Sequence, residues 1–162
     1  MKKELKHAHY IEKLARAIDE ALPYWEDSDA RLGGERSKRN PFPKGPGVYV
    51  ILRRVNVRGG RRVQKANAVS PLVLYVGKTT SRRAVKDRLS DHFGGGKPNY
   101  GGSQFTKFLF QLCQDDESVQ RILWSKDTLI AAVEIKEGDP VIDAVERLAM
   151  QVFKPRFNVK DR

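Results

Sequence analysis

A strand-to-helix junction in the middle of the chain carries side chains suited to chemistry on a phosphate. Residues 72–76 form an apolar run that predicts a buried strand, Gly77 ends it, and apolar side chains then recur at helical spacing over residues 81–93. The polar groups at this junction are a tyrosine, a lysine, an arginine and a histidine: Tyr75, Lys78, Arg88 and His92. Because Arg88 and His92 are four residues apart, they would lie on the same flank of the helix. Cationic and hydrogen-bonding groups so arranged favour an anionic phosphate as ligand.

A single carboxylate in the last predicted helix lies close to apolar surface. That helix is predicted to begin at Asp139, an N-cap acid followed by Pro140 at the first helical position, and to end before Pro155. Glu146 falls at the margin of its apolar arc, which comprises Val141, Ile142, Val145, Leu148, Ala149, Val152 and Phe153. A carboxylate against apolar surface needs a cation, a hydrogen-bond donor or a metal ion as partner. Taken alone, a glutamate that turns to solvent is the simpler explanation.

Two strands must bring these groups together. Residues 47–52 are β-branched and aromatic, which predicts a strand with Val48, Val50 and Leu52 on one face and Tyr49 and Ile51 on the other. Residues 53–71 would form an extended hairpin connection to the strand that ends at Tyr75. If the two strands pair antiparallel, Tyr49 and Tyr75 can share a face, but this depends on a register that the sequence leaves open.

The remaining elements are read from periodicity and from Gly and Pro positions. Residues 5–22 predict an amphipathic helix, and residues 23–46 a Pro/Gly-rich arm. Residues 94–102 are glycine-rich and predict a loop. Helices at 103–113 and 116–124 and a third strand at 128–135 complete the list. The single cysteine, Cys113, excludes an internal disulfide and suits a small buried side chain in a reducing compartment.

Charge is concentrated in one part of the chain. The 162 residues include 31 Lys and Arg against 20 Asp and Glu, a formal net charge of +11, and residues 31–65 hold eleven of the basic residues with one acid, Glu35. Such a concentration is typical of proteins that bind a polyanion, most often nucleic acid, although an ordinary solvated basic face explains the charge equally well. The candidate nucleic-acid contacts are Arg36, Lys38, Arg39, Arg53, Arg54, Arg58, Arg61, Arg62 and Lys65.

No apolar run approaches the roughly 20 residues that a membrane-spanning helix requires, and the N-terminus lacks the apolar region of a signal peptide. We therefore expect a cytoplasmic protein that does not enter a membrane.

In this order, the pieces resemble the GIY-YIG nuclease superfamily. Gly47-Val48-Tyr49 is similar to its first signature, and Tyr75-Val76-Gly77, followed by Lys78-Thr79, to its second. Arg88 and His92 match an arginine of the family and a histidine of several members through the pattern Arg-Leu-x-x-His-Phe, Glu146 matches a glutamate, and Pro155-Arg156-Phe157-Asn158 matches a terminal Pro-x-x-Asn. The resemblance covers about residues 46–159. Each match is weak alone, and the order of the five parts carries it.

The resemblance implies an α+β fold with a small central, mostly antiparallel three-stranded sheet flanked by helices. Residues 46–162 would be the catalytic domain, and residues 1–45 an N-terminal helix with the basic Pro/Gly-rich arm. It also implies a divalent-metal-dependent DNA endonuclease that leaves 5′-phosphate and 3′-hydroxyl ends. Since one site cuts one strand, double-strand cleavage would require a homodimer or successive nicks.

The resemblance assigns a role to each site residue. Glu146 would hold one Mg²⁺ or Mn²⁺ ion, Arg88 would bind the scissile phosphate, and Tyr75 would hydrogen-bond water or phosphate. Tyr49 would act as general base or relay a proton, with Lys78 and His92 as second candidates for the base. Asn158 would order the site rather than touch the reacting atoms.

The sequence departs from the family pattern in two places. Residues 50–74 separate the two signatures, which is longer than in compact members, and the arginine stands further beyond Gly77 than usual, so Arg82 or Arg83 could replace Arg88. The basic arm and the long connection favour restriction-like cutting. The alternatives are a structure-specific repair or recombination nuclease, a mobile-element nuclease, a nuclease that acts on RNA, and a binding module that does not cleave.

Overall fold

The computed structural model describes residues 7–23, 42–54, 71–93, 104–123, 125 and 127–158. In chain order the elements are α1 (Ala8–Asp19), β1 (Leu22–Pro23), β2 (Gly47–Arg54), β3 (Pro71–Lys78), α2 (Val85–Phe93), α3 (Gln104–Cys113), α4 (Asp116–Leu123), β4 (Thr128–Glu134) and α5 (Asp139–Phe153). Residues 24–41 of the predicted arm, residues 55–70 of the long connection and the glycine-rich loop lie outside the described residues.

The described strands form one antiparallel sheet in the order β1-β4-β2-β3. The α+β class is therefore confirmed, whereas the expectation of three strands is wrong because Leu22 and Pro23 add a short fourth strand beside Ile130 and Leu129. A two-residue strand is too short to show alternation in the sequence. Its proline is tolerated because β1 is an edge strand.

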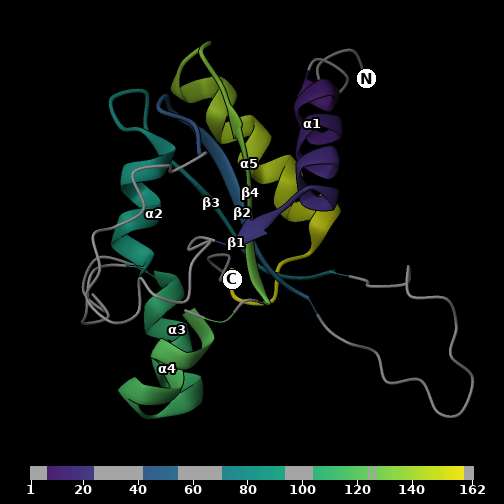
Figure 1. Ribbon diagram of the computed structural model, residues 1–162. Coiled ribbons are helices and arrows are strands. Elements are labelled where there is room, and N and C mark those ends of the chain that lie inside the picture. The colour runs from purple at the N-terminus through teal and green to yellow at the C-terminus, as the bar shows by residue number, and fades with distance from the viewer. Residues whose placement is uncertain are drawn as a thin grey trace, which may run out of the picture.

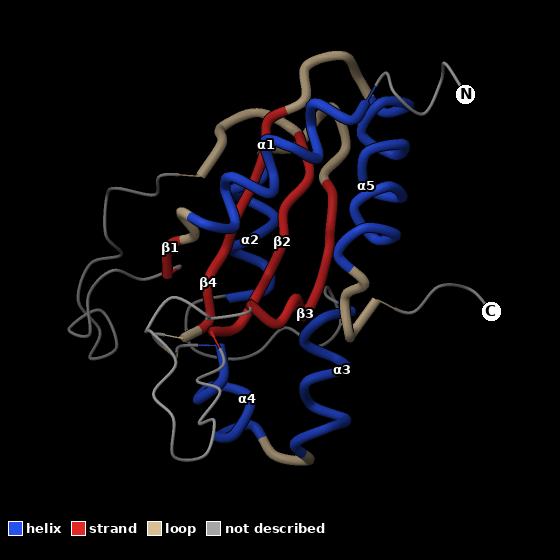
Figure 2. Tube along the Cα trace, turned by 90° about the vertical axis from the view of Figure 1, so that its right-hand side faces the viewer, coloured by secondary structure: helices blue, strands red, loops and turns tan. Residues whose placement is uncertain are grey.

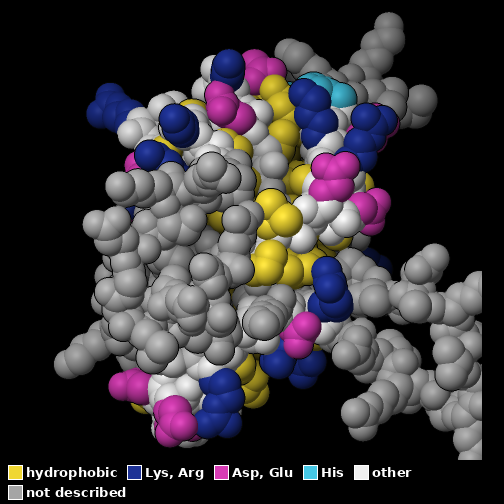
Figure 3. Space-filling model, viewed as in Figure 1, with side chains coloured by type: hydrophobic (Ala, Val, Ile, Leu, Met, Phe, Trp, Pro, Cys, Tyr) yellow, Lys and Arg dark blue, Asp and Glu magenta, His cyan; other side chains and the backbone are white. Residues whose placement is uncertain are grey.

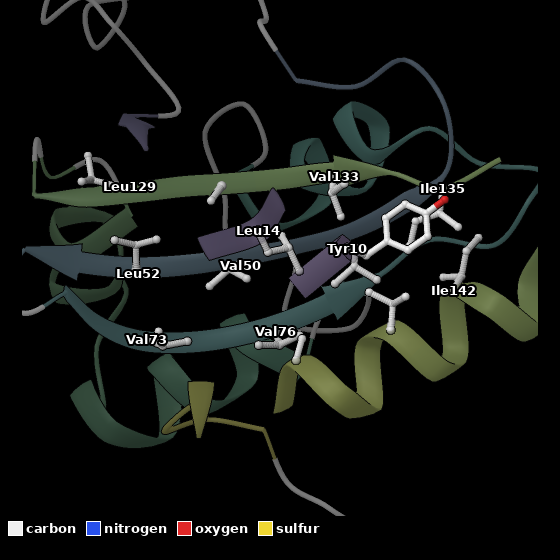
Figure 4. Packing of buried hydrophobic residues seen from close by; sticks show 14 residues of the cluster. Tyr10, Leu14, Val50, Leu52, Val73, Val76, Leu129, Val133, Ile135 and Ile142 are labelled. Atoms are coloured by element: carbon white, nitrogen blue, oxygen red, sulfur yellow. The ribbon is translucent and has the colours of Figure 1, made fainter. Parts of the chain in front are cut away.

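Alternation along β2 divides the core into two layers. Val48, Val50 and Leu52 face one cluster together with α1 and α5, while Tyr49 and Ile51 face the other together with α2, α3 and α4. Figures 1 and 2 show these helices on opposite sides of the sheet, and Figure 4 shows the α1/α5 cluster from close by. The predicted faces of this strand are thus confirmed.

A β-bulge in β3 follows the pairing of Tyr75 with Ile51. Ile51 pairs with Tyr75 but Leu52 pairs with Val73, so Leu74 is an extra residue between them. As a result Leu74 and Tyr75 both belong to the cluster that contains Tyr49, while Val73 remains in the cluster on the opposite face. The pairing with Ile51 therefore places Tyr75 on the side of Tyr49, and the bulge adds Leu74 to the same side.

Several helix ends differ from the predicted ones. α1 is shorter than residues 5–22, since it ends at Asp19 and Leu22 enters β1. α2 begins at Val85 rather than residue 81, because the preceding residues turn, with the Arg83 N–H bonded to the Thr80 carbonyl. Asp139 does not cap α5: Gly138 precedes the helix, and the Asp139 carboxylate accepts hydrogen bonds from the Ser81 N–H and hydroxyl instead.

Other expectations concern single side chains. Cys113 is half-buried rather than fully buried, because it ends α3 at the edge of the cluster that contains Phe105 and Leu109. α1 contributes Tyr10 and Leu14 to the core beneath the sheet. The division of the chain at residue 45 stays a prediction. Among the described residues no helix has the length and apolar character needed to cross a membrane.

Candidate active site

A buried tyrosine and a buried histidine form the centre of the candidate site. Neither Tyr49 nor His92 has solvent-exposed surface, and the Tyr49 hydroxyl lies 2.5 Å from His92 Nε2. β2 directs Tyr49 toward α2, and His92 lies on the buried stripe of that helix with Val85 and Leu89. The sequence predicted His92 on the flank of this stripe, facing the site, and the structure buries it completely.

Arg88 is the third member of this hydrogen-bonded group. Its guanidinium is hydrogen-bonded to the Tyr49 oxygen and also lies 3.2 Å from Asp91 Oδ2. An arginine can only donate, so it occupies one lone pair of the phenol oxygen, and the tautomer of His92 sets which group donates in the Tyr49–His92 hydrogen bond. Asp91 also accepts from Arg83 at 2.7 Å, which places a second guanidinium beside the first.

Burial sets the protonation states of the centre. It lowers the pKa of His92 to about 3, with Arg88 and Arg83 adding to the effect, so the imidazole is neutral at neutral pH. Burial likewise raises the pKa of Tyr49, and Arg88 opposes that rise. The centre at rest is therefore a protonated phenol bonded to a neutral imidazole.

Tyr75 joins the same group from β3. Its ring centroid lies 5.6 Å from that of His92, in an edge-on contact, and 6.3 Å from that of Tyr49. Burial raises the pKa of Tyr75, while the positive charge of Arg88 lowers it. The structure thus brings together four of the predicted residues: Tyr49, Tyr75, Arg88 and His92.

Two glycines of the predicted signatures are required by close approach. A Cβ on Gly77 would lie 2.3 Å from the Tyr49 ring and hydroxyl, because the two residues are cross-strand partners. A Cβ on Gly47 would lie 1.9 Å from the Val133 carbonyl oxygen. The Tyr49 ring and hydroxyl occupy the place that a side chain at residue 77 would take. Glycine at this position therefore allows the hydroxyl to reach His92.

Lys78 and Glu146 lie on the other face of the sheet. The Lys78 ammonium is 2.9 Å from Glu146 Oε2 and 2.9 Å from Asp143 Oδ1, both on α5. Burial lowers the pKa of Lys78, but the hydrogen bonds to Glu146 and Asp143 raise it overall, so Lys78 is a protonated cation. The Glu146 side chain is 16% exposed, which confirms a carboxylate held against apolar surface with a cationic partner.

The two halves of the site lie on opposite faces of the sheet near the end of β3. β3 is an edge strand, and the segment after α5 covers its outer side at Val73, Leu74 and Val76. The Glu146 carboxylate is close enough to raise the pKa values of both Tyr49 and Tyr75. A substrate atom at this edge would therefore have the phenols and Arg88 on one side and the Glu146 carboxylate on the other.

Asn158 supports the edge rather than the chemistry. Its side chain accepts a hydrogen bond from the Val76 N–H at 2.7 Å and donates one to the Val76 carbonyl at 2.6 Å. The N–H groups of Arg156 and Phe157 bond to the Val73 and Leu74 carbonyls. The segment after α5 thus pairs with β3 next to Tyr75, in the ordering position expected of Asn158.

Of the predicted nucleic-acid contacts, the structure describes only Arg53 and Arg54, and these two lie away from this centre. Arg53 and Arg54 end β2, so Arg53 lies about 13 Å from Tyr49 at 3.3 Å per residue. Arg53 lines a pocket of about 170 Å³ together with Leu72, Arg156 and Phe157. On the face seen in Figure 3, the described basic and acidic side chains alternate. The other seven predicted contacts lie outside the described residues: Arg36, Lys38, Arg39, Arg58, Arg61, Arg62 and Lys65.

The carboxylates suit a hard cation that keeps most of its water. Among the described residues no group of three or more His, Cys, Asp or Glu side chains could hold a metal ion. Glu146 and Asp143 together offer two carboxylates on one flank of α5, where they already hold a cation. Mg²⁺ is commonly bound through one or two carboxylates plus waters and substrate phosphate, so this donor set fits it.

Sequence reasoning missed three residues of the site. Asp143 and Asp91 hold Lys78 and Arg88, and Thr79 is buried and accepts the Gly47 N–H through its hydroxyl at 2.8 Å. Asp143 stands three residues before Glu146, a spacing that places both on one helix flank and was a usable signal. Asp91 likewise stands three residues after Arg88, and Thr79 follows Lys78 in the second signature, but neither position by itself shows that the residue supports the site.

Acid should destabilise the fold through His92. The imidazole titrates near 6.5 when unfolded and near 3 when folded, so between these values the unfolded chain binds more protons and stability falls as pH falls. We expect a change from pH 7.5 to 5.0 to cost about 2 kcal/mol more in the wild type than in His92→Gln. Urea unfolding at both pH values measures this difference. His9→Gln, at an exposed histidine, should keep the wild-type loss, and an equal loss in His92→Gln would contradict the lowered pKa.

Comparisons with known proteins identify no homologue of this chain. No family model matches this sequence, and no curated protein or solved structure matches it. The functional argument therefore proceeds from the geometry of the site and from the motifs of the sequence.

Proposed function

We propose that this chain is a divalent-metal-dependent endonuclease that hydrolyses DNA phosphodiester bonds to 5′-phosphate and 3′-hydroxyl ends, on a fold of the GIY-YIG type. The observation that carries the proposal is the environment of the Tyr49 hydroxyl. The hydroxyl is hydrogen-bonded to neutral His92 and to the guanidinium of Arg88, and its pKa, raised by burial, is raised further by the charge of the Glu146 carboxylate. A proton acceptor, a fixed positive charge and a metal-binding carboxylate are what phosphodiester hydrolysis requires.

The phenol and the imidazole provide a path for the proton of the attacking water. As water attacks phosphorus, its proton passes to the Tyr49 oxygen while the Tyr49 proton passes to His92 Nε2. The pKa of His92 is lowered by burial first and then by Arg88 and Arg83. A substrate phosphate bound to Arg88 offsets part of that positive charge, so the imidazole becomes a better acceptor when substrate is present.

The remaining charges act on the phosphate. Arg88 carries a planar fork of donors that suits two phosphate oxygens, and Asp91 fixes its orientation. Glu146 would hold the divalent cation, which would supply positive charge to the leaving 3′-oxygen. Lys78, whose pKa is raised by its carboxylate partners, is a poorer candidate for the base than the Tyr49–His92 pair.

The proposal is tested on purified full-length protein with supercoiled plasmid. We expect nicking in the presence of Mg²⁺ or Mn²⁺ and none in excess EDTA, with activity returning when the metal ion is added back. End-labelling should show that the cut ends carry 5′-phosphate and can be ligated.

A panel of duplex, branched and single-stranded DNA, together with RNA, separates the possible substrates. Preferred cutting of one duplex sequence would identify a restriction-like enzyme, and preferred cutting of branched DNA a structure-specific one. Binding to the panel without any cleavage would overturn the catalytic proposal in favour of a binding module.

A further inference from the structure

Lys78 occupies the place that a metal ion would take. Its ammonium lies 2.9 Å from one oxygen of Asp143 and 2.9 Å from one oxygen of Glu146, so one internal cation bridges both carboxylates. The two acids are three residues apart on α5 and present their oxygens on one flank of the helix. This geometry is that of a cation site whose present occupant is a side chain.

The position of Lys78 is fixed by the sheet. Its backbone pairs with Val48 at the end of β3, and the next residue, Thr79, bonds to Gly47 on both backbone and side chain. The Lys78 side chain is 38% exposed and that of Asp143 is 50% exposed, so water and ions reach the bridge from one side. The sheet thus fixes the backbone of Lys78, while the ammonium at the end of its side chain is accessible to solvent.

We propose that Lys78 is the resident counter-ion of the cation site, and that Asp143 and Glu146 exchange its ammonium for a divalent metal ion. The inference rests on the proposed function, because it concerns the same metal site. Two cations at one carboxylate pair repel each other, so an ion entering at Glu146 displaces the ammonium. In the absence of a metal ion, Lys78 neutralises the charge of Asp143 and Glu146, since two adjacent carboxylates without a cation would destabilise the folded chain.

Displacement gives Lys78 a second position. In the structure the ammonium lies on the α5 face of the sheet, held by Asp143 and Glu146. Once released from α5, it would be available to pair with an anion such as the substrate phosphate. Metal entry and the appearance of an additional phosphate contact are thereby coupled.

The test is Mn²⁺ binding to the full-length protein without DNA, followed by calorimetry and by electron paramagnetic resonance of the free ion. Lys78→Met removes the competing ammonium, so we expect it to bind Mn²⁺ about tenfold more tightly than the wild type, or about 1.4 kcal/mol. Lys78→Arg keeps the positive charge and should show no such gain. Lys136→Met, at an exposed lysine beside Glu134, controls for the general loss of one positive charge.

Asp143 is tested in the Lys78→Met background. Asp143→Asn should then weaken Mn²⁺ binding about fivefold or more, because a carboxylate ligand is lost. Lys78→Gln serves as a second variant, and circular dichroism checks that each protein is folded. Glu146-dependent binding is Mn²⁺ binding that Glu146→Gln abolishes. If such binding is present in the wild type, and Lys78→Met and Lys78→Gln leave it unchanged or weaken it, this inference alone is overturned. Absence of Glu146-dependent binding in every variant would overturn the metal site of the proposed function as well.

Discussion

Glu146→Gln is expected to abolish plasmid nicking, with a loss of at least about a thousandfold in rate, since a metal ion contributes several kcal/mol to the transition state of hydrolysis. Glutamine keeps the size of the side chain and a hydrogen-bond acceptor near Lys78, but it removes the negative charge that holds the cation. Glu146 is the more buried of the two carboxylates that hold Lys78, and the substitution leaves Asp143, which is half exposed, as the single remaining carboxylate of the pair. Nicking rates in Mg²⁺ and in Mn²⁺ measure the loss.

Glu117→Gln is the matched control for this substitution. Glu117 is an exposed carboxylate on α4 that pairs with Arg121, away from the two tyrosines. It should nick plasmid at the wild-type rate. Because Glu146→Gln loses only one charge, its DNA binding in EDTA should remain within a few-fold of that of the wild type. Equal nicking by Glu146→Gln and wild-type protein would refute the metal-binding role of this residue.

Gly77→Ala is expected to have the second large effect. The added methyl group would lie 2.3 Å from the Tyr49 ring and hydroxyl, and Tyr49 is enclosed in the core. To relieve the clash the ring must shift and the hydroxyl must leave His92. We expect about a hundredfold loss of nicking, since a 1 Å displacement of a catalytic group is sufficient for that. Overpacking should also lower the free energy of unfolding by about 1–3 kcal/mol.

Gly45→Ala makes the same chemical change where the chain can adapt. Its Cβ would lie 2.7 Å from the end of the Glu134 side chain, which is flexible and partly exposed and can move aside. Urea unfolding and nicking assays on both variants, side by side, measure the contrast. If Gly77→Ala retained wild-type stability and activity, Tyr49 would not need its present position for function.

Much of the fold follows from local pattern. Alternating residues in β2 correctly placed Tyr49 and Val50 on opposite faces, because strand side chains alternate whatever the partner strand is. Helical spacing in α2 correctly put Val85, Leu89 and Phe93 on the buried side. These patterns are local properties of the backbone, so they survive in any tertiary arrangement that buries the apolar face.

Other features were decided by competition between distant groups. Asp139 has the residue type and position of an N-cap, yet its carboxylate bonds to Ser81, which lies 58 residues away in sequence. β1 exists because the chain after α1 passes the open edge of β4, where Ile130 supplies a partner. No local pattern encodes either contact, since each depends on where another part of the chain lies.

The sequence by itself determined the chemical inventory of this protein: two tyrosines in strands, an arginine and a histidine one turn apart, a glutamate at the margin of an apolar helix face. Only the tertiary structure decided how they meet. The pairing of Tyr75 with Ile51 places Tyr75 on the side of Tyr49, and the end of β3 brings Lys78 to Asp143 and Glu146. The physical reason is that the local backbone sets how often side chains return to the same face of a strand or helix. Register, bulges and charge pairing instead depend on the free energy of contacts between elements far apart in sequence.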